Sequence, residues 1–293
     1  MDSDANAGAT VGDVCANERP HEVRRRPQTS TMHRYLLDAD DDLAREFDMR
    51  TRLAARTGTT ARVLLAELGE CDLTAAFSAL GKGFGLLVLD GLIAFEVAVG
   101  DRTATELVGA GDLITPARDR TDAMLECRAA YRVLAPAQLA MLDADFAARV
   151  RPWPQVVQAL VRRASRRTAE IDEMRAIACH PRLEVRLDLL FWHLAARWGR
   201  VEPNGIRLTL PLTHRVLGQL VAAERPSISH ALARLSNAGL VTGRAGDWHL
   251  HGSVQTHLSS LADRDAGRQS DTHSRQAAAN GSGSGRRRMR QGD

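Results

Sequence analysis

The segment from Leu208 to Ser253 constrains the fold more than any other part of the chain. It reads LTLPLTHRVLGQLVAAERPSISHALARLSNAGLVTGRAGDWHLHGS. Its apolar periodicity and its turn residues predict a short strand, a helix, a tight turn, a second helix and a β-hairpin. This order is typical of a winged helix-turn-helix, which we place near residues 201–252.

The two predicted helices have recognisable start signals. The first follows Thr213, whose hydroxyl suits an N-cap, and Gly218 permits a close approach to the second helix. The second has Pro226 in its first turn, where a missing N–H costs nothing. At about 100° per residue, its apolar positions form one stripe, and the opposite face is left exposed. The stripe consists of Ile228, Leu232 and Leu235.

The exposed face is a candidate surface for contacts to DNA. Arg225, at the start of the second helix, suits a bidentate contact to guanine. Hydroxyl groups and the tip of the hairpin suit phosphates. Any one of these residues could equally be an ordinary solvated side chain, so the prediction rests on the whole constellation. The candidate residues are Thr213, His214, Arg225, Ser227, Ser229, His230, Arg234 and Arg244.

Charge is unevenly distributed along the 293 residues, although the formal net charge is only +3. Residues 34–150 contain 13 basic and 19 acidic residues, whereas residues 151–250 contain 15 basic and 8 acidic residues. The second half is therefore the half that suits an anionic partner.

The first half has a different pattern. Between residues 60 and 135, short apolar runs alternate with turn residues at roughly ten-residue spacing, which predicts a β-roll over 34–150. From Trp153 the period changes to alternating steps of four and three, which predicts a long helix over 151–179. A narrow apolar stripe next to RRASRRT favours pairing with a second copy. The predicted dimerisation residues are Val157, Leu160, Ala164, Ile171 and Met174.

Cys179-His180-Pro181 ends this helix, because a residue before proline avoids the α region. A DNA-binding domain over 180–252 follows, and it opens with a helix whose predicted stripe is Val185, Leu189, Trp192 and Ala196. The termini, 1–33 and 253–293, lack periodicity and are predicted to be disordered. Arg286–Arg288 could touch phosphates, or the segment could simply be a solvated tail.

Several function classes find no support in the sequence. The four scattered cysteines form no C-x-x-C motif, and His249 and His251 have no further ligand at metal-binding spacing. We find no nucleophile elbow, Walker loop or H-E-x-x-H motif, and therefore expect no enzyme. No signal peptide or membrane span is evident, and we expect a cytoplasmic protein.

Three consecutive motifs of the C-terminal part resemble the Crp/Fnr family of bacterial transcription regulators. They are WHLAARWG, the run LTHRVLGQLVAAERPSISHALARLSNAGLV and W-x-L-x-G. LVGAGDLI resembles the glycine-bracketed turn of that family, and the likeness covers about residues 35–252. It implies an α+β fold with a cyclic-nucleotide-binding-like β-roll, a dimerisation helix and a winged helix-turn-helix. It also implies that Arg225, Ser227 and His230 occupy DNA-contacting positions.

After the turn in LVGAGDLI, the sequence differs from that of the family. Members that bind cyclic AMP have a glutamate soon after the turn and an Arg-Ser or Arg-Ala pair further on, whereas this chain reads GDLITPAR over 111–118. We therefore identify no cofactor and expect no cyclic nucleotide. The clustered N-terminal cysteines of iron–sulfur sensors are also missing.

The sequence thus predicts a homodimeric regulator that binds a near-palindrome in double-stranded DNA. It would act beside RNA polymerase, either under an effector that the sequence does not identify or under none. The alternative is a ligand- or protein-binding module whose winged helix serves protein interaction.

Overall fold

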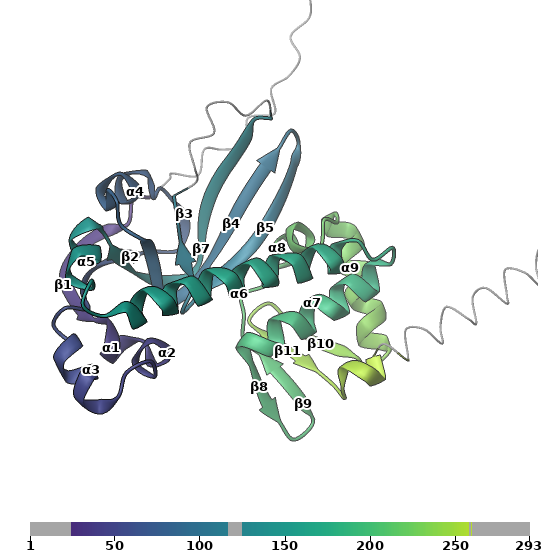
Figure 1. Ribbon diagram of the computed structural model, residues 1–293. Coiled ribbons are helices and arrows are strands. Elements are labelled where there is room, and N and C mark those ends of the chain that lie inside the picture. Colours follow the sequence, from purple (N-terminus) through teal and green to yellow (C-terminus); the bar gives the residue numbers. More distant parts are fainter. Residues whose placement is uncertain (1–24, 117–124, 258, 260–293) are drawn as a thin grey trace, which may run out of the picture.

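A computed structural model describes residues 25–116, 125–257 and 259 (Figure 1). The predictions of disorder for residues 1–24 and 260–293, together with Arg286–Arg288, lie outside the described residues. Among the described helices, none is both long enough and apolar enough to cross a membrane.

The N-terminal part is an antiparallel sheet with the strand order β1-β2-β7-β4-β5. The short β3 pairs with β7, and β6 pairs with β4. The α+β class and the β-roll are confirmed. The strands are β1 (Gln28–Tyr35), β2 (Thr60–Ala66), β3 (Gly69–Cys71), β4 (Gly85–Val99), β5 (Arg102–Gly109), β6 (Leu113–Ile114) and β7 (Cys127–Leu142).

The prediction that residues 1–33 are disordered is wrong from Gln28 onward. This segment belongs to β1, which pairs with β2 from Gln28 opposite Leu65 to Tyr35 opposite Thr60. Its polar sequence gives no period-two signal, and main-chain pairing with β2 holds the strand.

Five short helices close the ends of the roll. Asp40, Asp48 and Asp143 each cap the start of one of them, with a carboxylate that accepts a bond from a main-chain N–H. The helices are α1 (Leu36–Ala39), α2 (Asp41–Ala44), α3 (Met49–Ala55), α4 (Thr74–Leu80) and α5 (Ala144–Arg149).

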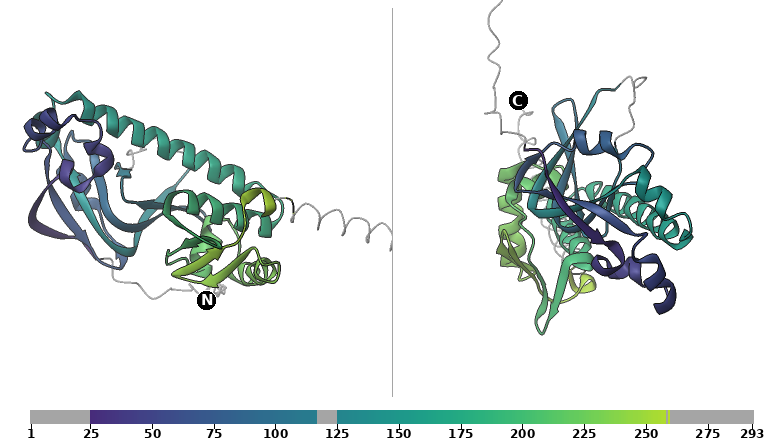
Figure 2. Two further views of the ribbon diagram at one scale, coloured as in Figure 1. Left: turned by 90° about the horizontal axis from the view of Figure 1, so that it is seen from below. Right: turned by 90° about the vertical axis from the view of Figure 1, so that its left-hand side faces the viewer.

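A single long helix, α6 (Pro154–Ala178), runs from the roll to the C-terminal domain (Figure 2). It stops before His180-Pro181, as predicted. Val156, Ala159 and Leu160 are buried with the residues of the roll. One face of α6 is therefore part of the core of its own chain.

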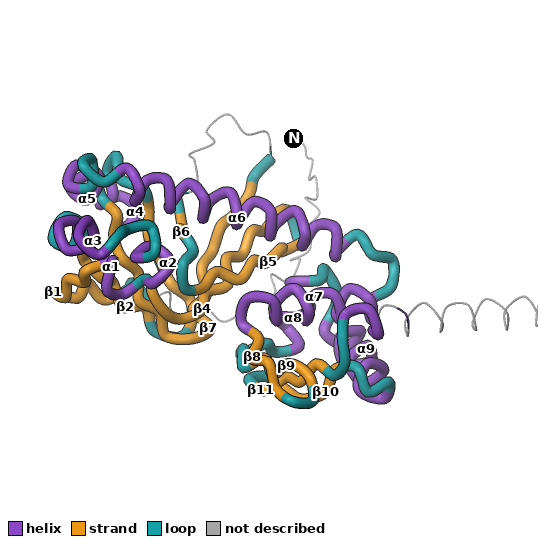
Figure 3. The backbone as a smooth tube through the Cα atoms, turned by 60° about the horizontal axis from the view of Figure 1, so that its bottom comes forward, coloured by secondary structure: helices purple, strands orange, loops and turns teal. Residues whose placement is uncertain are grey.

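The C-terminal domain has the predicted order of strand, helix, turn, helix and hairpin (Figure 3). Its sheet has the order β10-β11-β9-β8. The Thr213 hydroxyl accepts a bond from the N–H of Val216 and so caps α8 as expected. The elements are α7 (Leu183–Trp198), β8 (Gly199–Glu202), β9 (Gly205–Leu208), α8 (His214–Leu220), α9 (Arg225–Asn237), β10 (Val241–Arg244) and β11 (Asp247–Leu250).

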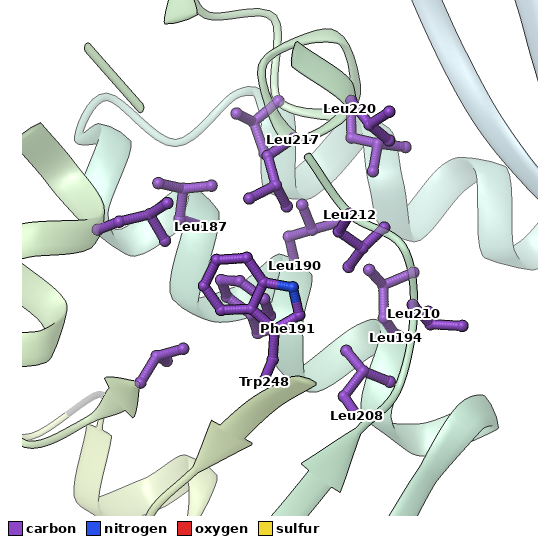
Figure 4. Packing of buried hydrophobic residues seen from close by; sticks show 14 of the residues in the cluster. Leu187, Leu190, Phe191, Leu194, Leu208, Leu210, Leu212, Leu217, Leu220 and Trp248 are labelled. Atoms are coloured by element: carbon purple, nitrogen blue, oxygen red, sulfur yellow. The ribbon is translucent and has the colours of Figure 1, made fainter. Parts of the chain in front are cut away.

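Helix α7 lies at the centre of this domain (Figure 4). Phe191 packs against Trp248, with ring centroids 5.0 Å apart. The predicted stripe is wrong in part, because Ala196 is exposed and Leu189 and Trp192 are only half-buried. The helix is covered on more than one side, so its buried positions are not limited to one stripe. They include Val185, Leu187, Leu190, Phe191 and Leu194.

The prediction of disorder from residue 253 is wrong at its beginning. Residues 254–257 are helical, and the His257 side chain is 0% exposed. Its Nδ1 lies 2.6 Å from the Asp188 carboxylate, which is itself fully buried in α7. A long-range ion pair of this kind leaves no periodic trace in the sequence.

Candidate nucleic-acid interface

The orientation of α9 decides whether a reading surface exists. Ile228, Leu232 and Leu235 are buried against the rest of the domain, whereas Arg225 and His230 are exposed. The predicted apolar stripe is therefore the anchoring face of α9. The opposite face is open to an external partner.

Gly218 in α8 allows the two helices to meet closely. A Cβ at this position would lie 2.5 Å from the carbonyl oxygen of Ala223 in the turn between α8 and α9. Any larger residue would push the turn outward and tilt α9. The predicted close approach is confirmed.

The start of α8, the start of α9 and the tip of the β10–β11 hairpin surround a cleft of about 350 Å³. Three exposed arginines line it, namely Arg215, Arg225 and Arg244. None of the three forms an ion pair with any residue that the structure describes. The cleft is thus a concentration of positive charge without an internal counter-ion.

Arg215 is a candidate that sequence reasoning missed. It follows His214 in a helix whose buried positions are Val216, Leu217 and Leu220. That spacing leaves Arg215 on the outer face of α8, so helical periodicity could have identified it.

The hairpin keeps its own carboxylate away from Arg244. Asp247 lies opposite Arg244 in the register, but its Oδ1 accepts a bond of 2.7 Å from Arg207 on β9. The hydrogen bond and the charge of Arg207 lower the pKa of Asp247. The carboxylate is therefore paired behind the wing, and Arg244 remains available at its tip.

Ser229 and His214 contact each other. The His214 Nδ1 and the Ser229 Oγ lie 2.9 Å apart, and the Ser229 hydroxyl also donates to the main-chain carbonyl of Arg225. The structure therefore uses both side chains to connect α8 with the first turn of α9. The Ser229 hydroxyl thus has two partners within the protein, and its contact to a phosphate stays a prediction.

Arg234 is also engaged inside the protein. Its Nε lies 2.5 Å from Oε1 of Glu184 in α7, and that carboxylate side chain is only 10% exposed. The pair fixes α9 on α7. The Arg234 side chain is still 49% exposed, so its contact to DNA stays a prediction. Thr213 is exposed and lines the cleft, and Ser227 is exposed in the first turn of α9.

The outer face of α6 is a second candidate surface. Val161 is 59% exposed, and Val157 and Ala164 are exposed with it. Together with Thr168 and Ile171, these positions alternate in steps of four and three, which is the spacing of a heptad seam. We call Val157, Val161, Ala164, Thr168 and Ile171 the outer stripe.

Two of the predicted dimerisation residues lie elsewhere. Leu160 is buried in the core between α6 and the roll, and Met174 packs against the core of the C-terminal domain. The four-three pattern exists in two overlapping registers on α6. Leu160 and Met174 belong to the register that faces the protein's own core.

Comparisons with known proteins agree with this architecture. Residues 185–251 match the family model of the Crp-like helix-turn-helix domain. A comparison with curated proteins finds no match.

Solved structures share the fold over most of the described chain. A cyclic nucleotide-binding domain containing protein from Listeria monocytogenes is 14% identical, with a TM-score of 0.53, and the match covers 65% of this chain and 89% of that one. FixK2 from Bradyrhizobium japonicum is 13% identical, with a TM-score of 0.51, and the match covers 68% and 96%. A CooA mutant from Carboxydothermus hydrogenoformans is 17% identical, with a TM-score of 0.50, and the match covers 67% and 85%. Residues 185–251 are therefore a Crp-like helix-turn-helix domain, in a chain that has the fold of Crp/Fnr-family transcription regulators.

Proposed function

We propose that the protein is a sequence-specific regulator of transcription that binds a near-palindromic operator as a homodimer. The observation that carries the proposal is Arg225, which is exposed and has no ion-pair partner among the residues that the structure describes. It stands at the start of a helix that three buried aliphatic residues fix in place. An arginine held in this way can offer its planar fork to the O6 and N7 atoms of guanine in the major groove.

The other two arginines of the cleft suit a different task. Arg215 and Arg244 line the same cleft as Arg225, from α8 and from the wing. Contacts from these flanking positions to the phosphates would orient α9 on the duplex without reading sequence. Ser227 and His230 complete the proposed surface, because both are exposed on α9.

We infer that a second copy covers the outer stripe of α6. Val157 and Val161 of this stripe are exposed in the described part of the chain, and its four-three spacing suits a parallel copy of the same helix. A two-fold axis along α6 would place two copies of α9 in successive major grooves, about 34 Å apart. The operator would therefore consist of two inverted half-sites.

The roll would then control DNA binding by the C-terminal domain. Arg167 of α6 donates two bonds, of 2.6 and 2.9 Å, to the Glu106 carboxylate on β5 and a third to the Leu113 carbonyl. We propose that a change in the roll would reach the long helix through these contacts. We propose an effector other than a cyclic nucleotide, and a site of action beside RNA polymerase in the bacterial cytoplasm.

Selection from a random library of duplexes tests the reading function. The full-length protein should enrich inverted half-sites whose centres lie about one helical turn apart, 10–10.5 base pairs. Enrichment of no common sequence would contradict the proposal. It would favour a role for the winged helix in binding protein instead.

Two matched substitutions in α6 test the dimer. Ala164→Glu places a charge in the outer stripe, whereas Ala169→Glu makes the same change at an exposed position outside it. Sedimentation velocity should find a monomer for Ala164→Glu and a dimer for Ala169→Glu. A dimer in both cases would show that the stripe is not the interface.

A further inference from the structure

The turn between β5 and β6 holds the end of α7. Asp112 in this turn is only 2% exposed, and its Oδ2 accepts a bond of 2.8 Å from the N–H of Gly109. The same oxygen lies 2.7 Å from Nη2 of Arg197, near the C-terminal end of α7. Arg197 also donates to the carbonyl oxygen of Ala110, at 3.0 Å. One turn of the roll thus binds a guanidinium of the DNA-binding domain.

The side chains around this ion pair are also closely packed. A Cβ at Gly109 would lie 3.1 Å from the Trp198 ring, so a side chain there would force the indole away. The guanidinium of Arg197 lies over the same ring, 4.5 Å from its centroid. Glycine at position 109 thus lets Trp198 and Arg197 pack closely on the turn.

The long helix joins the same network. Glu170 of α6 lies 3.4 Å from Nη1 of Arg197, and Arg166 lies 3.7 Å from Oδ1 of Asp112. Arg166 and Glu170 also lie 3.6 Å apart, one turn from each other on α6. We call Asp112, Arg166, Glu170 and Arg197 the junction network.

A continuous apolar contact surrounds the junction network. Leu92, Ala94 and Leu107, on the outer face of β4 and β5, are buried in the same cluster as the core of the C-terminal domain. Helix α8 lies against β5. Apolar packing can tolerate a small rotation, but a buried ion pair requires one geometry, because its charges are costly when separated. We therefore infer that the junction network, rather than the apolar packing, sets the orientation of the C-terminal domain on the roll.

We propose that Asp112 is a positioning residue for DNA recognition, which fixes the direction of α7 and hence of α9 by holding Arg197. The role rests on the proposed function. Arg225, His230 and the cleft are exposed in the held arrangement, so this arrangement leaves the proposed reading surface accessible to DNA. Asp112 lies in the roll, and it would act on DNA binding without touching DNA.

The test uses full-length Arg197→Gln, Asp112→Asn and the double variant. The matched control is Arg128→Gln, which removes an equal charge from an exposed pair with Glu126. Affinity is measured for the selected operator and for versions with the half-sites one or two base pairs closer or further apart. Circular dichroism and thermal unfolding confirm that each variant is folded.

We expect each single variant to bind the operator about five- to 150-fold more weakly, the usual range for coupling between sites. Its preference for one half-site spacing should flatten, which a general loss of stability would not cause. The double variant should be no weaker than the weaker single variant, because both remove one interaction. Arg197→Lys, which keeps the charge, should lie between Arg197→Gln and the wild type.

Unchanged or tighter binding by Arg197→Gln, or an unchanged spacing preference, would overturn the role of Asp112 while the proposed function stands. Wild-type protein that prefers no duplex would overturn the proposed function itself. The two failures are therefore distinguishable within one experiment.

Discussion

Arginine has opposite surroundings on the long helix α6 and on the helix-turn-helix. On α6, Arg163 is 6% exposed and donates two bonds of 2.6 Å to the Asp40 carboxylate, and Arg167 forms a similar pair with Glu106. On the helix-turn-helix, Arg215 and Arg225 are exposed and have no ion-pair partner among the described residues.

The difference shows that charge content alone does not locate a binding surface. Both regions are rich in arginine, but the arginines that face the roll are neutralised by carboxylates from the same chain. The arginines of the cleft, which have no ion-pair partner among the described residues, present a net positive field to an external anion. The comparison therefore predicts that buried arginines control folding and exposed ones control binding.

Arg163→Ala should have the largest effect. It leaves the Asp40 carboxylate, 8% exposed, without its counter-ion. We expect the free energy of unfolding to fall by about 3–5 kcal/mol, the cost of breaking a buried pair by removing one partner. Urea denaturation measures this value. Arg162→Ala is the control, because Arg162 is half-exposed in its pair with Glu46, and the expected change is about 0–1 kcal/mol.

The same pair predicts a response to acid. Burial alone raises the pKa of Asp40, but its hydrogen bonds to Arg163 outweigh burial and hold the pKa below the ordinary value. The stabilisation is present above the unfolded-state pKa of about 3.9 and is lost as pH falls through the lower folded-state pKa. Arg163→Ala should lack this acid-dependent loss. Equal acid sensitivity of both proteins would contradict the assignment.

His257→Gln tests the second buried pair. Burial by itself lowers the pKa of His257, but bonds to Asp188 and to the His251 carbonyl raise it overall. The stabilisation is therefore complete below about pH 6.5 and is lost as pH rises through the folded-state pKa. The substitution should remove about 1–3 kcal/mol at pH 6, with a smaller difference at high pH. If the difference in free energy of unfolding between the wild type and His257→Gln grew with pH, the upward shift of the His257 pKa would be contradicted.

Much of the fold followed from periodicity. The apolar positions Ile228, Leu232 and Leu235 predicted which face of α9 is buried, because local spacing alone determines that face. The outcome for α6 was less complete, because Leu160 and Val161 lie in two overlapping registers and only the position of the roll decides which of them is covered. Pairs such as Arg234 with Glu184 connect residues far apart in sequence, so no local pattern predicts them.

Arg225→Ala sharpens the comparison in terms of binding. We expect a loss of about 1–3 kcal/mol in operator affinity, confined to one base-pair position in each half-site, because the guanine contact is lost. The free energy of unfolding should hardly change. Arg234→Ala should do the reverse, with a loss of stability and an unchanged base preference. Affinities for operators with single base-pair substitutions distinguish the two variants. If both variants changed the base preference in the same way, the distinction between a reading arginine and a structural one would be wrong.

Arg244→Ala should have the smallest effect. A phosphate contact at the wing carries no sequence information, so affinity should fall evenly for all duplexes. The slope of log affinity against log salt should become shallower by about one. Titrations at four salt concentrations measure the slope. A changed base preference would instead indicate that the wing reads sequence.

The central claim is that the helix-turn-helix surface around Arg225 reads DNA sequence. The ratio of affinities for the selected operator and for a scrambled duplex of equal length, measured at physiological salt, tests it most directly. We expect a ratio of about 10³ or more for the wild type. A ratio near one would contradict it.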